Sequence, residues 1–387
     1  MYSYDQILHL DFESSSLCNA LCAICNRRHN GGVKTDMVET YVTLEQFTAW
    51  FPEKFLRQLS SMSMCGNYGD SMTNPEVLDI MRYTKSLNPN IRLTMHTNAS
   101  GRTPEFWTEL SELIGSKGNI IFSVDGLANT NWIYRRGTHW DKIMMAMENY
   151  KKGPGGSEWH FLVFKHNQHQ VEEARQLSQT LGIDEFYAKQ AFGFNDDALS
   201  GTTTRQFDVY NEHDNKVYSI EAPTESEFNI DDHIRSFEQS DPNIKTGYKR
   251  QSYTNKHEDT PLNDWEIKLG QTEIKCQVIP TRGVFVSSEG LVFPCCMTAG
   301  KLYAPNNPES NQLRKFVDSI GRDNMNLNYT TLESIVDGDI FHKRWPETWQ
   351  DNNIKNKRLR VCSMFCGVET NTTWKTVASS VGSYYGK

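Results

Sequence analysis

The sequence lacks any apolar run long enough to cross a membrane. Its first residues, MYSYDQILHL, also lack the charged segment followed by an apolar run that marks an export signal. We therefore expect a cytoplasmic protein without a membrane partner. An excess of basic residues is missing too, because 40 Lys and Arg stand against 48 Asp and Glu, a formal net charge of −8. This balance argues against nucleic acid as a partner.

Cysteine is absent from residues 66–275, so the nine cysteines are confined to the two ends of the chain. Three lie at positions 18, 22 and 25, Cys65 follows alone, and five lie at 276, 295, 296, 362 and 366. In a reducing compartment, clustered thiols hold metal more often than they form disulfides. The layout therefore favours metal binding.

Strand-like and helix-like patterns alternate about six times in the first 190 residues. Strands are predicted over 6–12, 61–65, 91–97, 119–126, 158–166 and 185–190. Helices are predicted over 43–59 (divided near Pro52), 75–87, 104–115, 139–152 and 168–182. This alternation is typical of an α/β fold with a parallel sheet, either open or curled into a partial or full barrel. Chemistry then sits at the carboxyl ends of the strands, where the first cysteines follow.

The chain divides by composition into four parts. Its 387 residues, 37% of them apolar, suffice for two cores. Residues 1–194 carry the alternation, and residues 273–370 carry the second cysteine set. Residues 195–272 between them are polar and weakly periodic, which predicts an insertion or lid, or equally an irregular linker. The C-terminal tail, 371–387, is uninformative.

The first cysteine set, Cys18, Cys22 and Cys25, has the spacing Cys-x3-Cys-x2-Cys. Three interpretations are open: thiols without a ligand role, a zinc site closed by His29, or a four-iron cluster held through three of its irons. Three thiolates leave one coordination position for a small molecule.

This motif, placed after the first strand of a repeating strand–helix domain, resembles that of the radical S-adenosylmethionine (SAM) superfamily. Asn19 is also usual in many members, whereas Ile24 departs from the aromatic residue that many carry there. The resemblance implies a partial (β/α)6 barrel with a [4Fe–4S] cluster on the three cysteines. It further implies that SAM chelates the open iron and is reductively cleaved to a 5′-deoxyadenosyl radical.

Three further stretches resemble SAM-binding motifs of the family, in the expected order. Tyr68-Gly69-Asp70 stands where the family has Gly-Gly-Glu, which receives the SAM amino group, although Asp is one methylene shorter. HTNAS (96–100) is similar to Thr-Asn-Gly and implicates Asn98. Ser123-Val124-Asp125-Gly126 resembles Ser-Ile-Asp-Gly, which implies that Ser123 contacts SAM and that Asp125 faces SAM or substrate. An ordinary polar or Asp-capped turn is the alternative for each.

Three further assignments are weaker. Arg135 or Arg136 is placed like the family's arginine near the SAM carboxylate, with a solvated surface pair as the alternative. For Asn167 a helix N-cap is preferred over a SAM contact. Cys65 is either a hydrogen-atom donor to a substrate radical or, more plainly, a buried barrel cysteine.

The second cysteine set begins with Cys276-x13-Gly290-x4-Cys295, which resembles the SPASM and twitch auxiliary-cluster domains of radical SAM enzymes. The segment between the two cysteines predicts a β-hairpin around residues 287–290, which would bring them together. Cys362 and Cys366, on a helical turn, would complete four ligands of one auxiliary [4Fe–4S] cluster, as in a small twitch-like domain. Cys296 is spare or replaces Cys295, and structural zinc is the alternative metal.

We therefore predict a radical SAM enzyme, an oxidoreductase or peptide-modifying enzyme assisted by one auxiliary cluster. The substrate is a peptide side chain or a small polar molecule such as an alcohol or sugar, and the electron donor is a flavodoxin or ferredoxin. The rival from another class is a non-catalytic zinc-binding scaffold. The sequence leaves open whether SAM is consumed or regenerated.

Overall fold

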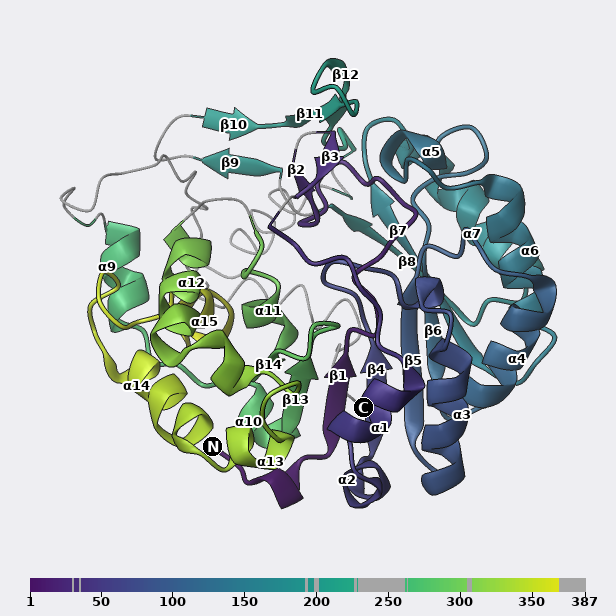
Figure 1. Ribbon diagram of the computed structural model, residues 1–387. Coiled ribbons are helices and arrows are strands. Elements are labelled where there is room, and N and C mark those ends of the chain that lie inside the picture. The colour runs from purple at the N-terminus through teal and green to yellow at the C-terminus, as the bar shows by residue number, and fades with distance from the viewer. Residues whose placement is uncertain are drawn as a thin grey trace.

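The computed structural model describes residues 1–29, 31–34, 36–191, 194–197, 202–225, 228, 262, 264–304 and 308–368 (Figure 1). The strands are β1 (His9–Phe12), β2 (Arg28–His29), β3 (Gly32–Val33), β4 (Ser61–Met64), β5 (Arg92–Thr97), β6 (Asn119–Ser123), β7 (Gly156–Val163), β8 (Glu185–Gln190), β9 (Asn195–Asp197), β10 (Thr202–Thr204), β11 (Gln206–Tyr210), β12 (Lys216–Glu221), β13 (Gly283–Val286) and β14 (Val292–Phe293). The α-helices are α1 (Leu44–Trp50), α2 (Glu53–Gln58), α3 (Val77–Leu87), α4 (Pro104–Ile114), α5 (Asn131–Tyr134), α6 (Trp140–Tyr150), α7 (Val171–Thr180), α9 (Asp264–Gln271), α10 (Val278–Thr281), α11 (Cys296–Ala299), α12 (Pro308–Ile320), α13 (Leu332–Val336), α14 (Trp345–Gln350) and α15 (Arg360–Cys366). Shorter helical turns are η1 (Tyr4–Gln6), η2 (Ser71–Thr73), η3 (Gln168–Gln170), η5 (Arg322–Met325) and η6 (Ile340–Arg344).

The main sheet has eight strands in the order β14-β13-β1-β4-β5-β6-β7-β8. β1 and β4 to β8 pair in parallel with their neighbours and form the partial barrel that the sequence predicts, with helices on its outer side (Figure 1). The six predicted strands are therefore confirmed, with ends shifted by a few residues. The chain is a mixed α/β protein with a mostly parallel sheet.

Local signals place the helices of the barrel. Thr43 and Gln46 form the predicted capping box at the start of α1, and Pro52 separates α1 from α2. Pro104 opens α4, where its missing N–H costs nothing. The short α5 was not predicted, because four residues carry too little periodicity to be recognised.

The outer face of the sheet is apolar and packs against the helices. Leu10, Met62 and Leu93 are almost fully buried there, as are Phe12 and Met95 farther along their strands. The alternate residues face the lumen of the barrel, and on β1, β4 and β5 they are polar and only partly buried. A parallel sheet is usually apolar on both faces, so this polar lumen is a departure that points to function.

The C-terminal hairpin continues the same sheet. β13 pairs in parallel with β1 at four positions and turns back as antiparallel β14, beside β1 in Figure 1. The predicted hairpin around 287–290 is thus confirmed, but its first strand begins only at Gly283. Residues 278–281 form α10 instead, because Pro280 has no N–H to give to a strand ladder.

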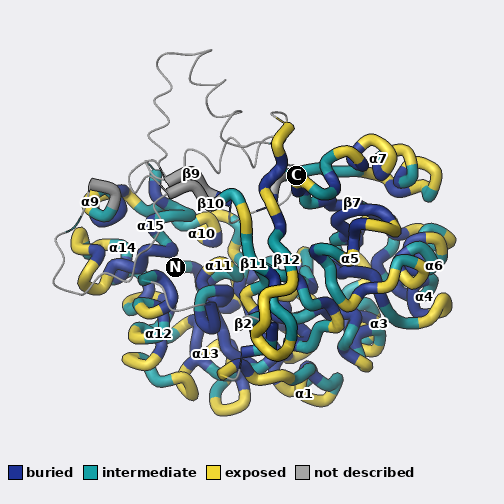
Figure 2. Tube along the Cα trace, turned by 90° about the horizontal axis from the view of Figure 1, so that it is seen from above, coloured by how far each residue is buried: buried dark blue, intermediate teal, exposed yellow. Residues whose placement is uncertain are grey.

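The polar segment contains two antiparallel hairpins within its described part, β9–β10 and β11–β12. Seen from above, β11 and β12 cross between the C-terminal helices and α5–α7 (Figure 2). The hairpin is tied to the barrel, since Arg136 donates to the Tyr210 carbonyl at 2.7 Å and Tyr218 to the Ile133 carbonyl at 2.6 Å. A lid role remains a prediction, and residues 229–261 and the tail 371–387 lie outside the described residues.

No helix in the described part of the chain is both long enough and apolar enough to cross a membrane.

Asp11 should give the fold a specific pH dependence. Burial raises the pKa of this lumen carboxyl from 3.8 to about 7. Between these values the unfolded chain ionises while the folded chain keeps the proton, so the contribution of Asp11 to stability falls as pH rises. The unfolding free energy of the Asp11→Asn variant, relative to that of the parent, should therefore rise by up to about 4 kcal/mol between pH 4 and pH 7. Above pH 7 this difference should stay constant.

Denaturant unfolding of both proteins at several pH values checks this difference. Burial lowers the pKa of His96 to about 3 and of His166 to about 4. These histidines change stability in the opposite direction, but they cancel when the variant is subtracted from the parent. A difference that stays constant with pH would contradict the prediction.

Candidate functional site

The first cysteine loop follows the carboxyl end of β1. Backbone hydrogen bonds connect it to the segment after β4 and to the segment after α5. The Asp70 N–H donates to the Leu17 carbonyl at 2.8 Å, and the Leu21 N–H donates to the Arg136 carbonyl at 2.7 Å. The short β2–β3 pair follows the last cysteine of the loop. Local turns therefore shape the loop, and contacts from elsewhere in the barrel fix its position.

The thiols of Cys18, Cys22 and Cys25 are brought together in this loop. Burial raises the pKa of Cys18 to about 12 and of Cys22 to about 11, and the neighbouring thiols add to both shifts. The Cys18 sulfur accepts from the Ala20 N–H at 3.4 Å and from Asn98 Nδ2 at 3.7 Å. The Cys22 sulfur accepts from Arg135 Nη1 at 3.7 Å. Donors aimed at enclosed sulfurs suit thiolate ligands, so this donor set fits an iron–sulfur cluster.

Asp125 and Arg135 form a buried ion pair beside the loop. Asp125 is fully buried, and its Oδ2 lies 2.5 Å from Arg135 Nε. Its Oδ1 accepts from the Leu162 N–H at 2.6 Å, and its carbonyl accepts from Asn167 Nδ2 at 2.9 Å. Burial raises the pKa of Asp125, and the Arg135 guanidinium opposes this rise. The ion pair connects the carboxyl end of β6 to the Cys22 sulfur.

The structure separates residues that the sequence left as alternatives. Arg135 lies at the cysteine loop, whereas Arg136 holds the β11–β12 hairpin. Asn167 precedes η3 at the N-cap position, but its side chain makes no cap hydrogen bond and braces Asp125 instead. The preferred N-cap role of the Asn167 side chain was therefore wrong.

Asp70 organises the turn that follows β5. Its Oδ2 accepts from the Asn98 N–H and from Asn98 Nδ2, both at 2.7 Å, and from Thr97 Oγ1 at 3.2 Å. Its Oδ1 accepts from the Met72 N–H at 3.1 Å. Asn98 also donates to Asn19 Oδ1 at 3.1 Å, within the cysteine loop. The Asp70 carboxylate is thus occupied by the chain's own donors, and through Asn98 it positions Cys18.

Glu13 holds the turn after β4, a role that the sequence did not predict. This buried carboxylate accepts from the Tyr68 N–H at 2.6 Å and from the Gly69 N–H at 3.3 Å. Burial raises the pKa of Glu13 to about 7. Gly69 is required sterically, because a Cβ there would lie 1.9 Å from the Ser15 carbonyl oxygen. The Ser123 hydroxyl, at the end of β6, makes no hydrogen bond with any other described residue.

The second cysteine set is assembled from three separate segments. The Ile274–Gly367 bridge and the hydrogen bond from the Lys275 N–H to the Cys366 carbonyl, at 2.9 Å, place Cys276 beside Cys366. Cys276 donates to the Cys366 sulfur, which lowers the pKa of Cys366 to about 7. Burial raises the pKa of Cys295 and of Cys362, the Cys366 thiol adds to both shifts, and the Cys295 thiol adds to the shift of Cys362. The set fits a four-thiolate centre.

Cys295 and Cys296 face different surroundings. Cys295 is adjacent to the other three cysteines of the second set, whereas Cys296 lies near Cys65. Burial raises the pKa of Cys65 well above its usual range, and Asp11 and Cys296 add to the shift. Tyr2 is a further neighbour that the sequence did not reveal, since it lies near both Cys276 and Cys295.

Among the described residues, no three His, Cys, Asp or Glu side chains are arranged to hold a single metal ion. The His29 side chain, the fourth ligand of the zinc alternative, lies outside the described part of the chain.

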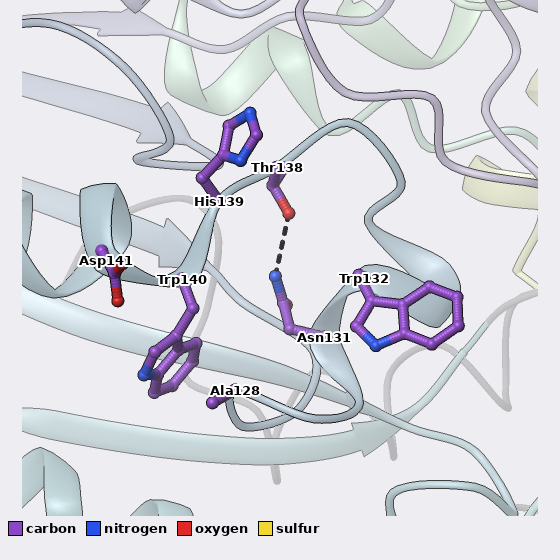
Figure 3. A pocket seen from close by; sticks show the side chains of 7 residues that line it. All are labelled: Ala128, Asn131, Trp132, Thr138, His139, Trp140 and Asp141. Atoms are coloured by element: carbon purple, nitrogen blue, oxygen red, sulfur yellow. Dashed lines mark hydrogen bonds between the residues drawn. The ribbon is translucent and has the colours of Figure 1, made fainter.

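A cavity of about 210 Å³ is lined by residues of α5, of the start of α6 and of the segments that precede these two helices (Figure 3). Asn131 lies between the two tryptophans of its lining, Trp132 and Trp140, and donates to Thr138 Oγ1 at 3.0 Å. The Asn131 Oδ1 accepts from the Asp125 N–H at 2.8 Å. The cavity is therefore backed by the network that holds Asp125.

Hydrogen bonds join the loops of the barrel to the segment after Cys295. The Tyr68 hydroxyl donates to the Ala299 carbonyl and accepts from the Tyr303 N–H, both at 3.1 Å. Asn67 Nδ2 donates to the Cys296 carbonyl at 3.0 Å, and Lys34 donates to the Tyr303 carbonyl. The turn next to Asp70 and the start of the second cysteine set are thus one connected unit.

The chain matches no protein-family model and no curated protein. Among solved structures it is similar to anSMEcpe with bound AdoMet (another abbreviation of SAM), at 13% identity and a TM-score of 0.52, with 96% of each chain covered. It is also similar to anSMEcpe with bound AdoMet and Kp18Cys peptide, at 14% identity and a TM-score of 0.50, with 96% of each chain covered. For Streptococcus suis SuiB bound to precursor peptide SuiA, the identity is 13%, the TM-score 0.48, and the coverage 88% of this chain and 67% of SuiB. The alignment with SuiB alone spans 63% of that chain. The two anSMEcpe structures, with TM-scores of 0.52 and 0.50, show that the chain shares their fold.

Removing Arg135 should destabilise the protein far more than removing its neighbour. Arg135→Met leaves the buried Asp125 charge without its partner, which should cost about 3–5 kcal/mol of unfolding free energy. Arg136→Met loses a hydrogen bond to one carbonyl and should cost about 1 kcal/mol. Denaturant unfolding of both variants measures the contrast, and equal losses would refute a structural role for the ion pair.

Tyr68→Phe should weaken the connection between the two cysteine sets. The variant leaves the Ala299 carbonyl and the Tyr303 N–H without a partner, which should cost about 1–3 kcal/mol. Hydrogen exchange at the Tyr303 amide should accelerate in parallel. Tyr83→Phe is the matched control, because the Tyr83 hydroxyl has no hydrogen bond to another described residue. An unchanged Tyr303 amide would show that the connection does not depend on Tyr68.

Proposed function

We propose that this protein is a radical SAM enzyme with one auxiliary iron–sulfur cluster. The observation that carries the proposal is the gathering of Cys18, Cys22 and Cys25 at the carboxyl end of β1, beside the buried pair of Asp125 and Arg135. The fold supports it, because the solved structures that share this fold include one with bound AdoMet at a TM-score of 0.52.

Cys18, Cys22 and Cys25 would hold a [4Fe–4S] cluster through three irons. When bound, that cluster would supply the one electron that reductively cleaves SAM to a 5′-deoxyadenosyl radical. Asn98 and Arg135 donate to the Cys18 and Cys22 sulfurs and so favour their thiolate forms. The Ser123 hydroxyl is available to contact SAM. The Tyr68-Gly69 backbone, which Glu13 holds in place, would contact the SAM amino group. Asp70 acts by positioning Asn98.

Cys276, Cys295, Cys362 and Cys366 would hold the auxiliary [4Fe–4S] cluster. Four protein thiolates leave no open iron for a substrate, so this centre suits electron acceptance in a net two-electron oxidation. Cys295, rather than Cys296, is the ligand in this assignment, since Cys295 interacts electrostatically with Cys276, Cys362 and Cys366.

The substrate we favour is a peptide, because the related fold of anSMEcpe is known with a bound Kp18Cys peptide. A small alcohol or sugar is the second candidate, supported by the polar lumen of the barrel. A reduced flavodoxin or ferredoxin would supply the electron. Cys65, kept as a thiol by its raised pKa, could return a hydrogen atom to a substrate radical where the product is not oxidised.

Iron content and SAM cleavage test the proposal together. Anaerobically reconstituted protein should hold about eight irons, and both Cys18/Cys22/Cys25→Ala and Cys362/Cys366→Ala variants should hold about four. With dithionite and SAM, the parent should release 5′-deoxyadenosine, and the first variant should release none. Cys296→Ala is the matched control and should keep all of its iron.

A colourless protein that holds zinc at both sites and leaves SAM intact would overturn the proposal. A variant lacking Cys18, Cys22 and Cys25 that keeps about eight irons would overturn the assignment of the first ligand set.

A further inference from the structure

Three polar side chains form a row in the lumen of the barrel. Asp11, Ser63 and Thr94 are register partners on the neighbouring parallel strands β1, β4 and β5. Each lies at a lumen-facing position, between residues whose side chains are buried against the helices. Parallel strands in register place such residues side by side, so one carboxyl and two hydroxyls line the same level of the lumen.

This row has no partner within the protein. None of the three side chains makes a hydrogen bond or ion pair with any residue that the structure describes. All three keep some accessible surface, so solvent enters the lumen at this level. Burial alone raises the pKa of Asp11 to about 7. An enclosed carboxyl without a partner lowers the stability of the fold. A fold that keeps such a group therefore points to a functional role for it, such as ligand binding.

The electrostatic surroundings of the row favour a positive ligand. Cys65 and Tyr2 are ionisable groups that interact electrostatically with Asp11. Burial raises the pKa of each, so both stay neutral. His96, at the next lumen position of β5, stays neutral because burial lowers its pKa to about 3. Arg92, at the previous lumen position of β5, lowers the pKa of His9 through its positive charge and makes no ion pair with Asp11.

We propose that Asp11, Ser63 and Thr94 bind a primary ammonium group of the substrate. An ammonium carries three donors and no acceptor, which matches one carboxylate and two hydroxyl oxygens. Its charge would keep Asp11 ionised and offset the cost of burying the carboxylate. The substrate is accordingly a primary amine, either a small amine or the lysine side chain of a peptide. That the bound amine is a substrate rests on the proposed function, whereas the ammonium site itself does not.

Equilibrium binding to the full-length, reconstituted protein with SAM present tests the proposal. The probes are n-butylamine and its neutral analogue n-butanol, followed by saturation-transfer NMR and calorimetry. Asp11→Asn should weaken butylamine binding at least about tenfold, because charge-assisted hydrogen bonds exceed neutral ones, and should leave SAM binding unchanged. Asp5→Asn is the matched control, since Asp5 is an exposed residue paired with Lys54, and it should change nothing.

The two sources of an ammonium are distinguished by a second pair of probes. Acetyl-lysine methylamide, with its side-chain amine free, is compared with acetyl-norleucine methylamide. Tighter Asp11-dependent binding of the lysine compound than of butylamine identifies a peptide side chain, and weaker binding identifies a small amine. Either result supports the site.

The proposal is overturned if Asp11→Asn binds butylamine as tightly as the parent, or if butanol binds as well as the amine, because the row then holds only water. Should Asp11→Asn fail to fold, Ser63→Ala and Thr94→Val each remove one acceptor and should weaken amine binding about threefold. Unchanged affinity in both variants also overturns it. A protein that binds the amine through Asp11 but leaves SAM intact keeps this site and loses the proposed enzyme function.

Discussion

The four-residue strand β1 is the constraint on which both cysteine sets depend. It pairs with β4 on one side and with β13 on the other, and the Glu13 N–H extends the second ladder to the Val286 carbonyl. The first cysteine loop continues directly from β1, and the second set is built around the hairpin that β13 begins. Because the paired strand lies some 270 residues away in the sequence, this single ladder brings the two ends of the chain into one sheet.

Buried carboxylates divide into two groups, and the division follows their partners. Asp70, Asp125 and Glu13 are each held by hydrogen bonds from backbone amides, and they fix the turns that surround the cysteine loop. Their burial is offset by these donors, so they are structural parts of the site. Asp11, on β1, has no such donors among the described residues, although it lies only two residues before Glu13, which follows the strand. Two acids within three residues therefore differ in their partners: Glu13 is hydrogen-bonded and organises a turn, whereas Asp11 has no hydrogen-bond partner among the described residues and is left for binding.

Sequence periodicity predicted the barrel because its strands and its longer helices carry local patterns, whereas the four-residue α5 does not. The cysteine motifs were also readable, since their spacing is local. The pairing of β13 with β1 was not, because no local pattern records a partner so distant. Glu13 was missed for the same reason, as its function depends on Tyr68 and Gly69, which reach it only through the fold. Likewise, the difference between Cys295 and Cys296 depends on where each side chain of two adjacent residues points at the start of α11.

The two cysteine sets also differ in when they can form. Cys18, Cys22 and Cys25 lie within eight residues, so a short loop can bring them together without the rest of the fold. Cys276, Cys295 and Cys366 meet only after the hairpin, the Ile274–Gly367 bridge and α15 have formed. In the proposed function, the local set would leave one coordination position open, whereas the assembled set would close with four thiolates. On that proposal, the centre that accepts a ligand would be carried by one short loop, and the closed centre by the segments that complete the sheet.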